Sequence, residues 1–226
     1  MTALSSRSEP STRASEEPAS QPALRDLDAL VSEIRACRLC VENPRGAPLP
    51  HHPRPVLRPS ATARIGVAGQ APGTRVHQSG VPFTDPSGIR LRDWMGVDEC
   101  EFYDDSRVAI LPMGFCFPGL DRHGGDRPPR RECAPRWRRD LLTAMPQLEL
   151  ILLVGSYALN WHLPDRRRRP VAETVHDFDA VLSIRTLPRL FPLPHPSWRN
   201  NAWIRDNPWF ETDVLPRLKA EVRRLL

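Results

Sequence analysis

The sequence predicts an α/β fold, a three-layer αβα sandwich around a central, mainly parallel sheet of four strands. Short apolar runs bounded by turn residues occur at 64–68, 108–112, 148–154 and 187–194, as is typical of buried strands. The segments between them carry apolar residues at helical spacing. Strands that alternate with helices along a chain form a parallel sheet with helices on both faces.

Helices are predicted from apolar spacing and from capping residues. The segments 24–35, 137–145 and 155–163 show the spacing, and a terminal helix opens at Asn207-Pro208. Ser87 is placed to cap a further helix. Its apolar side is formed by Ile89, Leu91, Trp94 and Met95. The prolines of 43–59 predict an extended surface connector.

The chain is expected to form one domain with a tail. Residues 1–23 are rich in Ser, Glu, Pro, Ala and Thr and cannot bury enough apolar surface to fold, so they are predicted to be disordered. Residues 24–226 form the predicted domain. We see no signal sequence, membrane span or obligate protein partner, and we expect a soluble, cytoplasmic monomer.

The charge balance favours a polyanionic partner. The formal net charge is +5, and nearly all the positive charge is arginine because Lys219 is the only lysine. Arginine is well suited to binding phosphate and to stacking on bases. The alternative is a genome that encodes arginine freely, which would explain the same bias without any partner.

The stretch 66–96 is predicted to form the centre of the functional site. The loop 69–73 follows the first strand and consists of small residues and a proline, so its backbone N–H groups are free to face a ligand. His77, Phe83 and Asp85 follow within a dozen residues. Ligands of open α/β sheets bind beyond the carboxyl ends of the strands, so a site is expected here.

The cysteines have the spacing of a metal site. Cys37 and Cys40 form a Cys-x2-Cys half-site, and Cys116 and Cys133 can supply the other half. Ligation by four cysteines suits either zinc or an iron–sulfur cluster, and Cys116 and Cys133 as plain buried thiols are the alternative. Cys100 fits neither half and is interpreted as a core or surface thiol.

Three motifs in the right order resemble the uracil-DNA glycosylase superfamily. The first is Gly69-Gln70-Ala71-Pro72-Gly73, followed by Gly80-Val81-Pro82-Phe83 and Ser87-Gly88; the second is His195-Pro196-Ser197; the third is the order of the four cysteines. The pattern is closest to the iron–sulfur branch found in bacteria and archaea. The resemblance runs from about Cys37 to the C-terminus, and it implies a 4Fe–4S cluster with a structural role, with structural zinc as the alternative.

The first motif departs from the family pattern. Gln70 stands where the iron–sulfur branch has Glu, and Ala71 stands where other members have the Asp that activates water. The asparagine that reads the edge of uracil has no counterpart, because 111–114 reads Leu-Pro-Met-Gly. The identity of the excised base and the group that positions the water are therefore open.

The resemblance, with the chemistry of base excision, suggests a role for each candidate residue. His195 would stabilise the departing base anion, and Gln70, His77 or Asp85 would position or activate water. Phe83 would stack on the extruded base, with a plain core phenylalanine as the alternative. The loop residues Gly69, Ala71 and Pro72 would surround the base. Contacts to DNA are assigned to Ser197, Trp198 and Arg199.

The resemblance therefore implies a monofunctional DNA glycosylase that removes uracil, or other deaminated bases, from DNA. A catalytically weakened relative that only recognises damaged DNA is one alternative. A hydrolase of free nucleosides or nucleotides is another, and it would show no salt-dependent binding to DNA.

Overall fold

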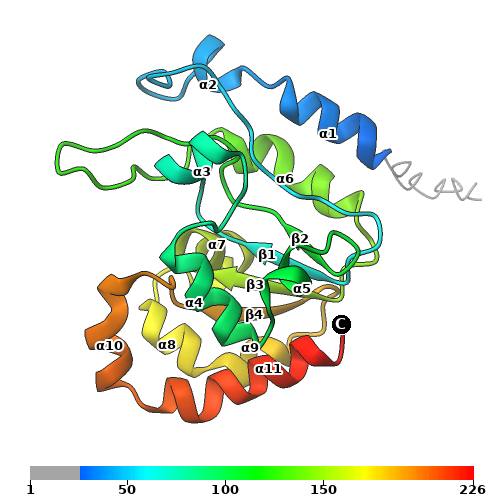
Figure 1. Ribbon diagram of the computed structural model, residues 1–226, viewed down its shortest axis with the longest axis vertical. Coiled ribbons are helices and arrows are strands. Elements are labelled where there is room, and N and C mark those ends of the chain that lie inside the picture. Colours follow the sequence, from blue (N-terminus) through cyan, green and yellow to red (C-terminus); the bar gives the residue numbers. More distant parts are fainter. Residues whose placement is uncertain (1–25) are drawn as a thin grey trace, which may run out of the picture.

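A four-stranded parallel sheet forms the centre of the protein, as predicted. The structure, a computed structural model, describes residues 26–226. The strand order is β2-β1-β3-β4, and each neighbouring pair is parallel (Figure 1). The strands are β1 (Ile65–Ala68), β2 (Val108–Ile110), β3 (Leu150–Val154) and β4 (Arg189–Leu193). The predicted tail, 1–23, lies outside the described residues.

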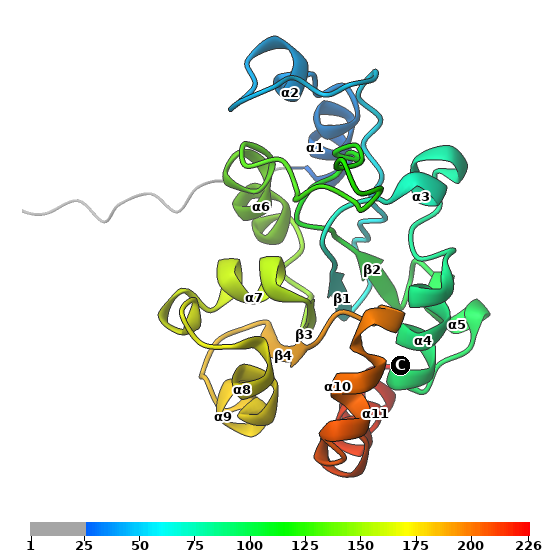
Figure 2. The ribbon, with the colours of Figure 1, turned by 90° about the vertical axis from the view of Figure 1, so that its left-hand side faces the viewer.

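Helices cover both faces of the sheet because the strands are buried on both sides. Ile65 and Val67 belong to one core, whereas Ala68 belongs to the other, as the period of two along a strand requires. The first core is covered by α4 (Pro86–Met95), α5 (Glu99–Tyr103) and α11 (Leu215–Arg223). The second is covered by α1 (Leu27–Arg35), α6 (Cys133–Thr143) and α7 (Ser156–His162). Figure 2 shows these two layers, with α8 (Val171–His176) and α9 (Phe178–Leu182) beside β4.

Helix α4 begins two residues earlier than predicted. Asp85, not Ser87, is its N-cap, and Oδ1 of Asp85 accepts a hydrogen bond of 3.1 Å from the N–H of Gly88. Pro86 then occupies the first turn, where its missing N–H costs nothing. Of the predicted apolar side, Leu91, Trp94 and Met95 are buried, but Ile89 is 63 % exposed.

The C-terminal stripe is buried as predicted. The segment η3 (Phe210–Val214) has π-helical hydrogen bonding and leads directly into α11. It keeps the apolar residues four positions apart on one side, where they pack beneath the sheet. The buried residues are Phe210, Val214, Leu218, Val222 and Leu225. The shorter elements are α2 (Leu39–Glu42), α3 (Thr74–Ser79), η1 (Pro164–Arg166), η2 (Trp198–Asn200) and α10 (Asn201–Asp206).

The connector 43–59 is more than a surface link. Leu49, Val56 and Leu57 are buried. Arg58 forms an antiparallel bridge with Ile110, in which each residue's N–H donates to the other's carbonyl at 2.9 and 2.8 Å. The connector therefore covers the open edge of β2, which would otherwise expose unpaired backbone groups.

Among residues 26–226, no helix combines the length and the apolar content that crossing a bilayer requires.

Candidate active site at the carboxyl edge of the sheet

A pocket of about 340 Å³ opens beyond the carboxyl ends of the strands. Its size falls within the range of about 300 to 1,000 Å³ typical of small-molecule sites. The connections after β1 and β3 leave toward opposite sides of the sheet, which creates a crevice between them. Predicted site residues on its wall are Gly69, Gln70, Ala71, Pro72, Phe83, Asp85, His195, Ser197 and Arg199.

The loop 69–73 forms one wall of the pocket. Its carbonyl groups are bound, because the N–H of Met113 donates to Gly69 at 2.8 Å and that of Gly114 donates to Gln70 at 2.9 Å. Within residues 26–226, the N–H groups of Gln70, Ala71 and Gly73 donate no hydrogen bond. The loop is therefore fixed from behind while its donors stay available, as the sequence predicts.

Phe83 lines the pocket next to this loop and has a strained backbone conformation. Its φ is +58°, in the left-handed region that larger residues rarely adopt. The ring lies against Gly69, where a β-carbon would stand 3.0 Å from Cζ of Phe83. It also packs edge-on to Phe102, with 5.9 Å between ring centroids. The half-buried ring is therefore held in one place beside the loop.

His195 is held rigidly where β4 ends. It lies between Pro194 and Pro196, both buried, and the side-chain amide of Asn200 donates to its carbonyl at 2.6 Å. Gly155, which follows β3, lies next to His195. A β-carbon at Gly155 would stand 3.5 Å from Cβ of His195, an ordinary contact distance. Neither ring nitrogen hydrogen-bonds to any residue in 26–226, so both are available to a ligand.

The surroundings of His195 favour its neutral form. Burial lowers the pKa of the His195 imidazole, Asp85 opposes this effect, and Arg199 adds to it. A neutral ring carries one N–H donor at neutral pH and can hydrogen-bond to an oxygen that gains negative charge.

Of the residues predicted to position or activate water, Asp85 makes a structural hydrogen bond and His77 lies outside the pocket. Asp85 lines the pocket, but one of its oxygens caps α4. His77 does not line the pocket. Its ring lies 4.3 Å from that of His51 and 5.5 Å from that of Phe117, between centroids. Burial lowers the pKa of His77, and the nearby His51 and Arg54 lower it further.

Two polar residues of the pocket were given no role from the sequence. Asp126 lines the pocket from the segment between β2 and α6, and Asn200 lines it from η2. The segment around Asp126 is full of Gly, Pro and Arg and shows no periodicity, so nothing indicated which way its side chains point. One feature of the sequence could have indicated Asp126: it is an acidic residue directly after Gly124-Gly125, in a loop that follows a strand end.

The residues predicted to contact DNA lie at the mouth of the pocket. Ser197 and Arg199 line it, whereas Trp198 does not and is 70 % exposed. The Arg199 guanidinium lies 5.8 Å from the Trp198 ring centroid. Arg90 on α4 donates to the carbonyl of Ser197 at 3.0 Å, which anchors the turn.

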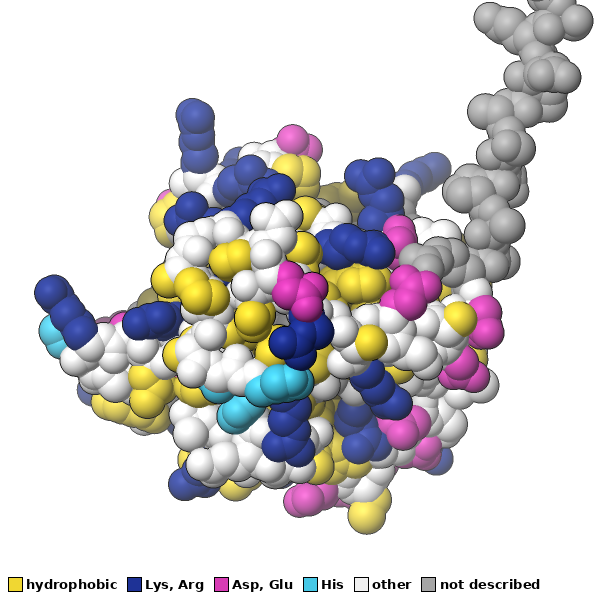
Figure 3. Space-filling model, turned by 90° about the horizontal axis from the view of Figure 1, so that it is seen from above, with side chains coloured by type: hydrophobic (Ala, Val, Ile, Leu, Met, Phe, Trp, Pro, Cys, Tyr) yellow, Lys and Arg dark blue, Asp and Glu magenta, His cyan; other side chains and the backbone are white. Residues whose placement is uncertain are grey.

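Basic side chains are spread widely over the end of the molecule that carries α2. Figure 3 shows them on this end, around patches of apolar side chains, with a projection at the left that ends in basic and histidine side chains. Arg64 precedes β1, at the edge of the sheet opposite the pocket, and pairs with Glu149 at 2.7 Å.

The four predicted ligand cysteines line one narrow internal pocket. They come from the end of α1, from α2, from the segment after β2 and from the start of α6, which meet at the top of Figure 1. They are Cys37, Cys40, Cys116 and Cys133. Cys100 lies on α5, is exposed and does not line this pocket.

The arrangement of these thiols bears on the kind of metal group they could hold. Within residues 26–226, no three His, Cys, Asp or Glu side chains are arranged to hold a single metal ion. Burial raises the pKa of Cys40 to about 11 and that of Cys116 to about 12, as expected of thiols with no metal beside them. The N–H of Phe115 donates to Sγ of Cys133 at 3.4 Å, a contact that favours a negatively charged sulfur.

A buried guanidinium lies near the cysteine pocket. Arg138 on α6 is 1 % exposed, and it donates to the carbonyl of Leu111 and to Nε2 of His162. Burial and this cation lower the pKa of His162 to about 3, so His162 is neutral. No carboxylate within residues 26–226 forms an ion pair with Arg138. Burial lowers the pKa of the Arg138 guanidinium to about 10, and the electrostatic interaction with Cys133 opposes this effect.

Comparison with known proteins identifies the family. One solved structure, wild-type SMUG2 of Pedobacter heparinus, is 14 % identical, with 70 % of this chain and 76 % of that chain covered and a TM-score of 0.40. The family model described as the uracil DNA glycosylase superfamily matches residues 55–219, which include the loop 69–73, Phe83 and His195. The chain therefore belongs to the uracil DNA glycosylase superfamily, a family of DNA N-glycosylases.

Proposed function

We propose that this protein is a monofunctional DNA glycosylase that hydrolyses the N-glycosidic bond of uracil, or of other deaminated bases, in DNA. The observation that carries the proposal is the meeting of the loop 69–73, Phe83 and His195 around one pocket. A lyase reaction needs an amine nucleophile. The sole lysine, Lys219, lies on α11 against Gly96 and away from the pocket, so monofunctional hydrolysis is the simpler expectation.

The residues of the pocket divide the chemistry of base excision between them. The flipped base stacks on Phe83. As the bond breaks, the base takes up negative charge, and the free N–H groups of the loop together with the neutral His195 ring stabilise that charge. Gln70 orients the water or the base but cannot accept a proton. Pro112 lies on the pocket wall and belongs to the segment 111–114, which contains no asparagine to read the base.

The mouth of the pocket suits DNA. Trp198 and Arg199 stand beside it, exposed enough to fill the gap that a flipped base leaves in the duplex. The formal net charge of +5 favours phosphate, and Arg122 and Arg127 lie on the hairpin next to the pocket. DNA with one damaged base is therefore the proposed partner.

We propose a 4Fe–4S cluster, rather than a zinc ion, as the group that the cysteine pocket holds. The four thiols line one cavity without converging on a single ion position, and the buried Arg138 can balance the charge of an anionic cluster. Cys37, Cys40, Cys116 and Cys133 would hold it. When bound, the cluster ties four segments together and supplies no electron to the hydrolysis.

Loss of one ligand cysteine is expected to remove the cluster. Protein purified without oxygen should be brown and contain iron and sulfide, whereas Cys37→Ala should be pale and less stable because the ligand set is broken. Absorption spectra, metal analysis and thermal unfolding measure this. Cys100→Ala is the matched control and should keep its colour. Colourless protein that holds one zinc ion per chain would contradict the iron assignment and leave the site in place.

A second candidate function is recognition of damaged DNA without excision. It is favoured by the lack of an acid at Ala71 and of an asparagine in the segment 111–114. Hydrolysis of free nucleosides is a third candidate, but that reaction would leave the exposed Trp198 and Arg199 without a role.

Comparison of substrates separates a DNA glycosylase from a nucleoside hydrolase. We expect base release from oligonucleotides that contain one uracil, no release from free deoxyuridine, and DNA binding that weakens as salt is added. Duplex and single-stranded oligonucleotides with other deaminated bases then define the range. Release from deoxyuridine without binding to DNA would contradict the proposal.

A further inference from the structure

The segment between β2 and α6 forms an ordered hairpin beside the pocket. Leu120 and Asp126 form an antiparallel bridge, and the N–H of Arg127 donates to the carbonyl of Gly119 at 2.9 Å. At the turn, Oδ1 of Asp121 accepts hydrogen bonds from two N–H groups, those of His123 at 2.8 Å and Gly125 at 2.9 Å. The hairpin projects at the left of Figure 1. Its own hydrogen bonds thus fix the position of Asp126.

The Asp126 carboxylate lies beside the first-motif loop, at Gly73. A β-carbon at Gly73 would stand 3.0 Å from Oδ2 of Asp126, so the acid lies next to the loop whose N–H groups are free. Asp126 lines the same pocket as Gln70 and His195. Within residues 26–226, its carboxylate accepts no hydrogen bond and forms no ion pair. It is therefore an ordered acid that no structural contact explains.

The other acids and bases near the pocket are less suitable. Asp85 caps α4 through one oxygen, and the ring of His77 lies outside the pocket against His51 and Phe117. Gln70 cannot take a proton, and Ala71 has no polar group. Asp126 is the pocket carboxylate with both oxygens available.

We propose that Asp126 is the catalytic base that holds and deprotonates the water attacking C1′ of the damaged nucleotide. This inference rests on the proposed glycosylase function and deepens it. The bond between C1′ and the base nitrogen breaks, and its electron pair leaves with the base. A bond forms between C1′ and the water oxygen, and one water proton passes to the Asp126 carboxylate. The acid missing at Ala71 is thus replaced by one from the segment between β2 and α6.

The charges around Asp126 predict how the reaction depends on pH. Burial raises the pKa of Asp126, Asp85 and Asp121 raise it further, and Arg199 lowers it. Asp85, His195 and Arg199 are the other charged or titratable groups on the pocket wall. Only the carboxylate form accepts a proton, so the rate falls as the pH falls through this raised pKa. These three residues are the same in wild type and in an Asp126 variant, so the difference between the two pH profiles isolates Asp126.

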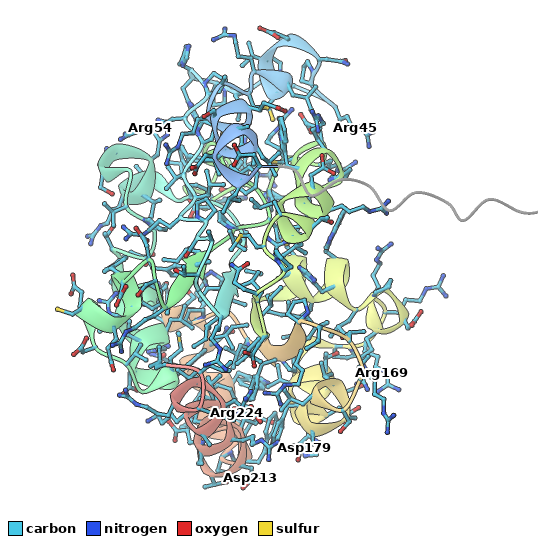
Figure 4. The ribbon with its side chains drawn as sticks, turned by 90° about the vertical axis from the view of Figure 1, so that its right-hand side faces the viewer. Arg45, Arg54, Arg169, Asp179, Asp213 and Arg224 are labelled. Carbon is cyan, nitrogen blue, oxygen red and sulfur yellow. The ribbon has the colours of Figure 1, made fainter. Side chains whose placement is uncertain are left out.

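The test compares Asp126→Asn with wild type on an oligonucleotide containing one uracil. The single-turnover rate should fall about 100-fold, as for other lost general bases, and the variant should lose the decline of rate at acidic pH that Asp126 causes in wild type. DNA affinity should not weaken. Asp213→Asn makes the same chemical change on η3, at the end of the molecule opposite Arg54 (Figure 4), and should keep the wild-type rate. Thermal unfolding of each variant verifies the fold.

Three results would overturn the inference. A rate for Asp126→Asn within threefold of wild type removes Asp126 from the chemistry but leaves the glycosylase function standing. A slow Asp126→Asn protein that keeps the wild-type pH profile assigns Asp126 a structural role. If wild type releases no base from any oligonucleotide, the proposed function fails, and this inference fails with it. If Asp126→Asn does not fold, Asp126→Glu serves instead and must shift both the rate and the pH profile.

Discussion

His195→Ala is expected to lower the single-turnover rate of uracil excision by about 100- to 1,000-fold. The ring lies on the pocket wall with neither nitrogen hydrogen-bonded to residues 26–226, and burial lowers its pKa, which favours the neutral form. Its hydrogen bond to the base strengthens as the base becomes an anion, so the lost stabilisation belongs mainly to the transition state. DNA affinity should change little because phosphate contacts supply most of it.

The control for this variant is another histidine. His176→Ala alters an exposed ring on α8 that packs edge-on to Trp209, far from the pocket, and should keep the wild-type rate. Quenched-flow or manual sampling with enzyme in excess gives the rates, and fluorescence anisotropy gives the affinities. Excision by His195→Ala at the wild-type rate would remove His195 from the chemistry.

Gly88→Ala is expected to destabilise the protein by about 3 kcal/mol or more. An added β-carbon would stand 1.8 Å from the carbonyl oxygen and 2.5 Å from the carbonyl carbon of Phe83. Neither atom can move freely, because Phe83 is held by Gly69 and Phe102 and its carbonyl accepts a hydrogen bond from Arg92 at 3.3 Å. For a domain of this size, such a loss lowers the melting temperature by roughly 6 to 12 °C.

Gly124→Ala is the matched control for the clash. Gly124 has a φ of +77°, but a β-carbon there meets nothing within 4 Å, so only the backbone conformation is penalised, by about 1 kcal/mol. Urea unfolding measures both variants. Equal free energies of unfolding for Gly88→Ala and Gly124→Ala would contradict the packing described for Phe83. The comparison also gives a physical reason for the glycine of the Ser87-Gly88 motif: a side chain at position 88 would occupy the space that the Phe83 backbone needs.

The fold could be predicted because the strands are short, apolar and buried on both faces. The length of the run Leu150–Val154 and the turn residues beside it indicate a buried strand rather than a helix. Capping was harder to predict. Both Asp85 and Ser87 are good caps, and the choice depended on Phe83, whose left-handed backbone sets where the helix begins. The buried connector was missed because its proline content indicated a surface segment, whereas the edge of β2 needed cover.

The candidate site, like the fold, could be predicted only in part. Residues that directly follow strands β1 and β4 were expected at one edge, because parallel strands end together. The structure brings Gln70 and His195 to one pocket accordingly. Asp126 could not be found, since its position depends on a hairpin held by the side chain of Asp121. His77 follows the loop closely in sequence, yet α3 directs its ring toward His51. The roles of all these residues stay predictions.

Direct detection of the freed base tests the central claim. Wild-type protein purified without oxygen is incubated with a duplex containing one uracil, and both products are identified by mass spectrometry. Binding is measured in parallel. A monofunctional glycosylase releases free uracil and leaves an intact strand with one abasic site that breaks only after alkali. Tight, salt-dependent binding to the same duplex with no uracil released, on duplex or single strand, would contradict the account and favour recognition of damage without excision.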